Sequence, residues 1–170
     1  YSAIRNYKRP CENACKVKAI SRGENNAAHI DNDKCISCGA CVYQCPFGAI
    51  VDKSYIVNII KMLQECQKNG TDVYAVIAPA IAAQFDYASI GQIITAIKML
   101  GFKDVIEAAL AADMIAWKES QEIAEKGFLT SSCCPAFFNY IHKHMPQMIE
   151  HISHNNSPMV EMGTILKKMD

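Results

Sequence analysis

The chain has 170 residues, of which 51% are hydrophobic and 20% are charged, and its formal net charge at pH 7 is zero. This composition supplies apolar side chains for one core, or for one core and a small satellite domain, and it excludes a disordered chain. The lack of a basic excess argues against binding to nucleic acid or to an anionic membrane surface. No apolar run approaches the roughly 20 residues that cross a bilayer, so membrane insertion is not expected either.

Nine cysteines are the unusual feature of the composition. Six lie between Cys11 and Cys45, Cys133 and Cys134 are adjacent, and Cys66 stands alone. An odd number of crowded thiols does not predict a disulfide framework; it favours metal ligation in a reducing cytoplasm. The chain begins with Tyr rather than Met, so we expect it to be processed or to be a piece of a longer protein.

The first part of the chain, residues 1–53, has no long apolar period. Within it, the pattern C-x2-C-x2-C-x3-C-P is complete at Cys35, Cys38, Cys41 and Cys45. This spacing arranges three thiolates around one cubane 4Fe-4S cluster and directs the fourth to a neighbouring cluster. The motif predicts a small iron–sulfur domain, with zinc as the weaker alternative.

An internal repeat extends this prediction. The segment 41–50 aligns with the segment 11–20 at an offset of 30 residues, with the same spacing of cysteines and the same Ala-Ile pair. The repeat resembles the bacterial two-cluster ferredoxins, whose halves exchange their last cysteine. This resemblance implies an α+β fold and one 4Fe-4S cluster with four ligands: Cys15, Cys35, Cys38 and Cys41.

By the same resemblance, Cys45 pairs with Cys11 on a second cluster. The repeat places Arg5 and Lys8 where the first two cysteines of that cluster should stand, and neither side chain can replace a thiolate. Two alternatives follow: the missing ligands lie upstream of Tyr1, or the second cluster is absent.

Beyond residue 53, apolar strands alternate with amphipathic helices, which predicts an α/β domain around a mostly parallel sheet. Helices are expected over 55–68, 90–100 and 113–126, and strands over 73–77, 105–109 and 128–130. Gly70 suits the end of the first helix, and Pro135 and Pro158 suit the starts of two more. The sequence thus predicts a ferredoxin-like domain over 1–53, followed by part of an α/β domain over 54–170.

The adjacent thiols lie in Ser-Ser-Cys-Cys-Pro, residues 131–135, between an expected strand and an expected helix. Neighbouring cysteines rarely form a disulfide with each other because the geometry is strained. The carboxyl end of a strand is where α/β sheets place their chemistry. On this motif alone, a reactive pair and a pair of small buried apolar side chains remain equal alternatives.

The order of the motifs resembles the iron-only (FeFe) hydrogenases over essentially the whole chain. The ferredoxin motif is followed by Ile-Ala-Pro-Ala at 77–80, Ala-Ala-Asp at 111–113, the thiol pair and Ser-Pro at 157–158. The family's T-S-C-C-P signature is matched with Ser131 in place of Thr. The resemblance implies that 54–170 is the first part of the α/β domain that holds the H-cluster, a 4Fe-4S cubane bridged by a cysteine to a two-iron site.

The resemblance also assigns roles to single residues. Cys134 would ligate the cubane, and Cys133 would donate a proton to the amine that bridges the two-iron site. Ala78, Pro79 and Ala80 would line the two-iron pocket, although a turn that closes a strand explains them equally well. The family's other cubane ligands lie beyond the Ser-Pro segment, so we expect this chain to be a fragment or to need a partner.

A proton path is implied as well. Glu119 and Glu122 are one helical turn apart and share a face, and Ser153 matches the serine of the family's path. Lys126 is its outer member. Such a chain of polar groups is what proton delivery to a buried metal hydride requires. The alternative is a solvated helix face without a proton-transfer role.

The function implied by the resemblance is the reversible reduction of protons to H2, with electrons relayed through 4Fe-4S clusters. Ferredoxin or a similar electron carrier, and other hydrogenase subunits, are the implied partners. Two other functions remain open. One is a non-catalytic electron-transfer module, and the other is a hydrogenase-like protein of iron–sulfur assembly.

Overall fold

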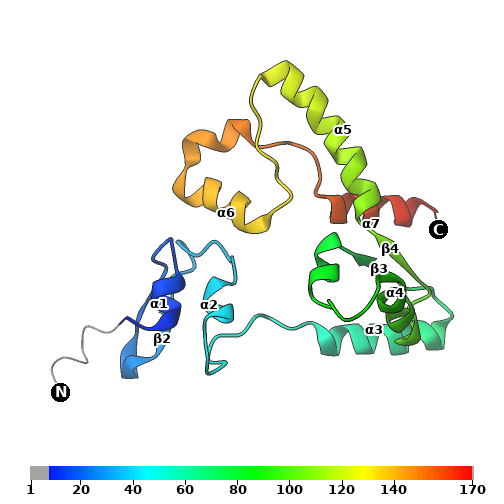
Figure 1. Cartoon of the computed structure of the whole chain (residues 1–170), viewed down its shortest axis with the longest axis horizontal. Coiled ribbons are helices and arrows are strands. Elements are labelled where there is room, and N and C mark those ends of the chain that lie inside the picture. The colour runs from blue at the N-terminus through cyan, green and yellow to red at the C-terminus, as the bar shows by residue number, and fades with distance from the viewer. Residues whose placement is uncertain (1–7, 170) are drawn as a thin grey trace. The chain divides into compact units, whose positions relative to one another are not determined.

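A computed structural model describes residues 8–169 of the chain, so Arg5 lies outside the described residues (Figure 1). The chain divides into two compact units. Of the described residues, 8–53 and 130–152 belong to unit 1, and 54–129 and 153–169 belong to unit 2. The first break coincides with the expected domain boundary after Lys53, whereas the segment that carries the thiol pair packs with the Cys-rich residues.

The Cys-rich part of unit 1 consists of two short helices and one hairpin-like sheet. Helix α1 (Pro10–Ala14) packs against helix α2 (Ala40–Tyr43). Strands β1 (Ile20–Arg22) and β2 (Ala28–Ile30) pair antiparallel, with the short helix η2 (Glu24–Asn26) between them. This small α+β arrangement agrees with the fold expected for residues 1–53.

The 30-residue repeat recurs in the backbone of this unit. Lys18 N–H donates to the carbonyl of Cys15 at 3.2 Å, and Gly48 N–H donates to the carbonyl of Cys45 at 3.4 Å. Lys18 and Gly48 both have left-handed backbones, with φ of 54° and 60°. A lysine in this region is uncommon. The left-handed backbone of Lys18 indicates that tertiary contacts fix the conformation of the turn after Cys15.

Unit 1 is completed by helix α6 (Pro135–His144) and the 3-10 segment η4 (Pro146–His151). The expected start of a helix at Pro135 is confirmed. The expected strand over 128–130 is wrong, because only a single parallel bridge forms, between Thr130 and Ile152. Thr130 N–H donates to the carbonyl of His151 at 2.7 Å. The partner residue, Ile152, directly follows the 3-10 segment η4, so the pairing does not extend beyond this one bridge.

Unit 2 contains a parallel pair of strands and helices near the expected positions. Its elements are α3 (Ile56–Asn69), β3 (Tyr74–Ile77), η3 (Pro79–Ala83), α4 (Ile90–Met99), β4 (Asp104–Glu107), α5 (Ala109–Lys126) and α7 (Pro158–Met169). Tyr74 pairs with Asp104 and Ile77 with Glu107. Helix α5 begins four residues before the predicted start, because Ala109 to Ala112 are strong helix formers that directly follow the strand.

The core of unit 2 lies between the strand pair and the helices. Helix α7 packs on α5 and contacts β3, and Met162 of α7 is only 1% exposed. The other buried apolar side chains of this unit are Ile77, Ile93, Val105, Ala108, Ala111 and Ile115. Among the described residues, no helix is both long enough and apolar enough to cross a membrane.

Candidate functional site

The loop that carries the first cysteines of the complete motif is shaped by its own side chains. Asp31 forms an ion pair with Lys34 at 2.9 Å, and its carbonyl accepts the N–H of Cys35 at 2.9 Å. Ser37, with a left-handed φ of 59°, donates its N–H to the Cys35 sulfur at 3.4 Å. Amide donors of this kind stabilise a thiolate, because an ionised sulfur is a stronger acceptor than a thiol.

The pKa of the third cysteine of the motif, Cys41, depends on burial and on the neighbouring cysteines. Burial raises the pKa of the Cys41 thiol, and the nearby negative charges of Cys35 and Cys38 raise this pKa further, partly offset by backbone N–H groups. Negative charge on Cys35 or Cys38 thus disfavours ionisation of Cys41. A bound iron cluster supplies the positive charge that offsets this effect.

The last cysteine of each half accepts the same hydrogen bond. Ala19 N–H donates to the Cys15 sulfur at 3.1 Å, and Ala49 N–H donates to the Cys45 sulfur at 3.2 Å. Hydrogen bonds from the backbone N–H groups that follow Cys45, that of Phe47 first, lower the pKa of its thiol. The peptide groups that follow Cys45 thus favour its thiolate form, and both sulfurs accept a backbone hydrogen bond from the residue four positions later.

These observations fit one 4Fe-4S cluster on Cys15, Cys35, Cys38 and Cys41. Each corner iron of a cubane takes one thiolate, so its ligands surround the cluster and do not meet at a single point. In the part of the chain that the structure describes, no three His, Cys, Asp or Glu side chains form a group that could hold a single metal ion. That finding includes the four histidines between residues 142 and 154.

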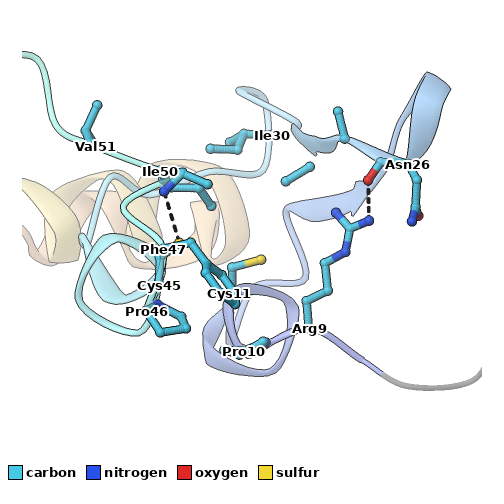
Figure 2. A pocket seen from close by; sticks show the side chains of 13 residues that line it. Arg9, Pro10, Cys11, Asn26, Ile30, Cys45, Pro46, Phe47, Ile50 and Val51 are labelled. Atoms are coloured by element: carbon cyan, nitrogen blue, oxygen red, sulfur yellow. Dashed lines mark hydrogen bonds between the residues drawn. The ribbon is translucent and has the colours of Figure 1, made fainter. Parts of the chain in front are cut away.

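Cys11 and Cys45 lie at a separate cavity of about 820 Å³ (Figure 2). Cys11 is only 7% exposed. The side chains around the two thiols are mostly apolar and include Pro10, Ile30, Pro46, Phe47, Ile50 and Val51. Lys8 is exposed, and no third thiol lines the cavity among residues 8–169. Two thiols do not fit a second 4Fe-4S cluster, which takes four thiolates.

The thiol pair lies directly before α6. Cys134 has an extended backbone, with φ of −95°, and its carbonyl accepts the N–H of Phe138 at 2.9 Å in the first turn. Cys133 N–H donates to the Ser131 hydroxyl at 3.5 Å. Both thiols are exposed. The alternative that they are small buried apolar side chains is therefore wrong for this structure.

Glu122 and Ser153, which are 31 residues apart, meet within unit 2. The Ser153 hydroxyl donates to the Glu122 carboxylate at 3.2 Å, Asn155 Nδ2 donates to it at 3.0 Å, and Lys126 Nζ donates to it at 2.7 Å. The Lys126 ammonium is the main cause that lowers the pKa of Glu122, aided by the His154 N–H and the Ser153 hydroxyl. Ser153 is 4% exposed and the Glu122 side chain 13%, so this contact is not a solvated helix face.

Sequence reasoning missed Asn155, whose amide joins the same carboxylate. Asn155 N–H also donates to the Ser153 hydroxyl at 3.2 Å, so one short polar segment supplies both residues. The run of polar residues between His151 and Ser157 was the available signal. Glu119 lies one turn before Glu122 on α5.

The segment Ala78–Pro79–Ala80 follows the carboxyl end of β3. Ala78 precedes η3 and Pro79 is its first residue, and all three residues are exposed. Ala108 N–H donates to the carbonyl of Ile77, which joins the ends of the two parallel strands. The carboxyl ends of parallel strands are the usual ligand-binding edge of such sheets. This placement is consistent with a pocket lining and equally with a strand-closing turn.

Amide-supported cysteines in a small α+β unit define the class of this molecule as an iron–sulfur protein. Comparison with known families agrees: residues 28–51 match the family described as "4Fe-4S binding domain". Residues 71–170 match "Iron only hydrogenase large subunit, C-terminal domain". Since the second match covers more than half of the chain, the chain belongs to the iron-only hydrogenase large-subunit family.

Individual relatives agree with this membership. The chain is 28% identical to NADP-reducing hydrogenase subunit HndD of Solidesulfovibrio fructosivorans, over 78% of this chain and 26% of the relative. It is 28% identical to the periplasmic [Fe] hydrogenase large subunit of Nitratidesulfovibrio vulgaris, over 81% of this chain and 44% of the relative. It is 26% identical to cytosolic Fe-S cluster assembly factor NAR1 of Candida dubliniensis, over 89% of this chain and 28% of the relative. The chain thus spans less than half the length of each.

Proposed function

We propose that this chain is the electron-input and proton-input part of an iron-only hydrogenase that reversibly reduces protons to H2. The observation that carries the proposal is the hydrogen bond between the Ser153 hydroxyl and the Glu122 carboxylate. The family resemblance assigns both residues to one proton path, and their separation of 31 residues gives no local reason for them to meet. Location in the cytoplasm and ferredoxin or a similar carrier as electron donor belong to the same proposal.

On the electron side, the chain holds one 4Fe-4S cluster through Cys15, Cys35, Cys38 and Cys41. When bound, such a cluster supplies one-electron transfer. The protein's part is to present four thiolates and to direct backbone N–H groups at their sulfurs, as the N–H groups of residues 19 and 37 do. These donors and the partial burial of the site adjust how readily an electron is accepted.

On the proton side, Glu122 is the acceptor of the relay. Its lowered pKa keeps the Glu122 carboxylate ionised near neutral pH, and Lys126 Nζ donates a hydrogen bond to it on the outer side of the proposed path. The Ser153 hydroxyl donates to Glu122 in this structure. For onward transfer, that hydroxyl turns away from Glu122, the protonated carboxyl gives its proton to the Ser153 oxygen, and the serine releases its original hydroxyl proton to the next acceptor. Cys133 is the proposed final donor.

For the H-cluster itself, this chain supplies one assigned ligand, Cys134. One thiolate does not suffice to hold a whole H-cluster. In this proposal the remaining ligands come from other parts of the hydrogenase large subunit.

A second candidate is a role in iron–sulfur cluster assembly without hydrogen chemistry. The observation that favours it is that the match to the assembly factor covers 89% of this chain, a larger share than the match to HndD. Both functions use the same cysteine motifs, so hydrogen chemistry is the property that separates them.

The test uses a large subunit that carries residues 1–170, matured anaerobically and examined by infrared spectroscopy and H2 evolution. We expect CO and cyanide stretching bands. Cys134→Ala should lose the bands, because the cubane loses a ligand, whereas Cys133→Ala should keep them and lose H2 evolution, because no proton reaches the bridging amine. Cys66→Ala, at the cysteine on α3, is the control and should change neither property.

Two results would contradict the proposal. Absence of the bands from the unchanged protein would favour the assembly function. Full H2 evolution in both the Cys133 and Cys134 variants would remove the roles assigned to the thiol pair.

A further inference from the structure

One face of α6 contacts the loop that presents Cys35. Lys143 Nζ donates to the carbonyls of Asn32 and Cys35, each at 2.7 Å. One position further along α6, His144 Nε2 lies 2.9 Å from the carbonyl of Lys34. These contacts join residues more than 100 positions apart, and nothing in the local sequence signals them.

A third side chain of α6 reaches the next peptide group of the loop. Asn139, one helical turn before Lys143, donates its Nδ2 to the carbonyl of Ile36 at 3.5 Å. The C=O of Ile36 and the N–H of Ser37 belong to one planar trans peptide and point in opposite directions. Holding this carbonyl at α6 therefore directs the Ser37 N–H toward the Cys35 sulfur, where it lies at 3.4 Å.

Among residues 8–169, Lys143 forms no ion pair with a carboxylate. Its ammonium instead donates to two main-chain carbonyls. A positive charge beside a cluster ligand stabilises the reduced cluster, because reduction adds one negative charge. The side chain is exposed, so salt will partly screen this effect.

We propose that Lys143 is a positioning residue for the 4Fe-4S cluster: it fixes the loop that presents Cys35 and raises the reduction potential of the cluster. This inference rests on the cluster ligands named in the proposed function. Helix α6 is 10 residues long, about 15 Å, and it begins at Cys134 and Pro135. The same rigid element thus holds the cluster loop near one end and carries the proposed H-cluster ligand at the other.

The experiment reconstitutes the whole chain anaerobically with iron and sulfide and measures iron content and the reduction potential of the cluster by EPR-monitored titration. We expect Lys143→Met to bind four irons and to show, at a fixed potential, a ratio of reduced to oxidised cluster that is lower by up to about tenfold. For a one-electron couple, tenfold corresponds to 59 mV. Lys143→Arg should restore the potential, and the difference between Met and wild type should shrink at high salt. Lys61→Met, on the exposed face of α3, is the matched control.

An unchanged potential in Lys143→Met, with four irons bound, would overturn the proposal. If Lys143→Met loses iron, Lys143→Gln decides, since it keeps a donor and removes the charge: a lower potential supports the proposal and a wild-type potential overturns it. Failure of the unchanged chain to bind four irons would overturn the ligand set of the proposed function, and this inference with it. Loss of H2 evolution alone would not affect the inference, because the potential is measured without turnover.

Discussion

Glu122 shows at the level of single residues how a carboxylate is kept ionised and oriented. It accepts hydrogen bonds from Lys126, Ser153 and Asn155, and the helix carries its close charge partner at i+4. Three donors from two separate segments define the direction of both carboxylate oxygens. Such an arrangement favours a group that receives protons along one route over a group that exchanges them freely with solvent.

We expect Glu122→Gln to destabilise unit 2 by about 1–2 kcal/mol at pH 7, the size of a hydrogen bond to a charged group. The folded-state pKa of Glu122 is lowered, so this stabilisation is present above the unfolded-state pKa, about 4.3, and is lost as pH falls through the folded value. The stability difference between the two proteins should therefore shrink as pH falls below about 4.3 and vanish below the folded-state pKa of Glu122. Urea unfolding, followed by fluorescence of the single Trp117 on α5, measures this. Glu125→Gln, at an exposed site on the same helix, should show no such pH dependence.

The resemblance assigned Glu122 and Ser153 to one proton path, and the structure shows a hydrogen bond between them. Their assigned proton-transfer role remains a prediction. The contacts of Asn155 with Glu122, and of Asn139 and Lys143 with the loop 32–36, were not predictable. Tertiary packing decides these partners, and no sequence spacing signals them. Periodicity reports which face of a helix is apolar; it does not report which carbonyl a lysine will reach.

Helices of unit 2 were predicted well because their apolar periods and end signals agree. Gly70 adopts the expected left-handed φ of 67° after α3, and α7 starts at Pro158. The strand expected near residue 130 failed because a strand needs a partner, and the partner segment forms a 3-10 turn. Element type follows from local pattern, whereas strand pairing depends on residues elsewhere in the chain.

Helix α7 supplies the most completely buried large side chain of the described residues, and this gives a prediction for that element. Met162→Ala should lower the free energy of unfolding of unit 2 by roughly 2–5 kcal/mol, because it leaves a cavity between packed elements. Met159→Ala, on the same helix at a side chain that is 45% exposed, should change it by less than about 0.5 kcal/mol. Urea unfolding followed by Trp117 fluorescence measures both. Equal effects of the two substitutions would mean that α7 does not pack on α5 as described.

For the whole molecule, the grouping of residues 130–152 with the Cys-rich residues is the feature that sequence alone did not indicate. The contacts that create it link side chains of α6 to the loop 32–36. The domain boundaries of 1–53 and 54–170 remain a prediction from composition. Composition changes mark where local patterns switch, but they do not say which later segment returns to pack on an earlier one.

The two units differ in how much apolar core they have, and this difference predicts their response to iron removal. Among the described residues, unit 1 buries four apolar side chains, of Cys11, Ala19, Ile141 and Ile152, whereas unit 2 buries seven, including Ile93 and Met162. A segment with so small a core depends on its metal centre for stability. Chelating the iron of the reconstituted chain should therefore speed amide hydrogen exchange in residues 8–53 and α6 by more than about tenfold, which corresponds to 1.4 kcal/mol of lost protection. The strands β3 and β4 and helix α7 should keep their protection, because their core contains no cluster ligand. Equal loss of protection in both units would show that they unfold as one, and unchanged exchange around Cys35 would show that the cluster does not support this unit.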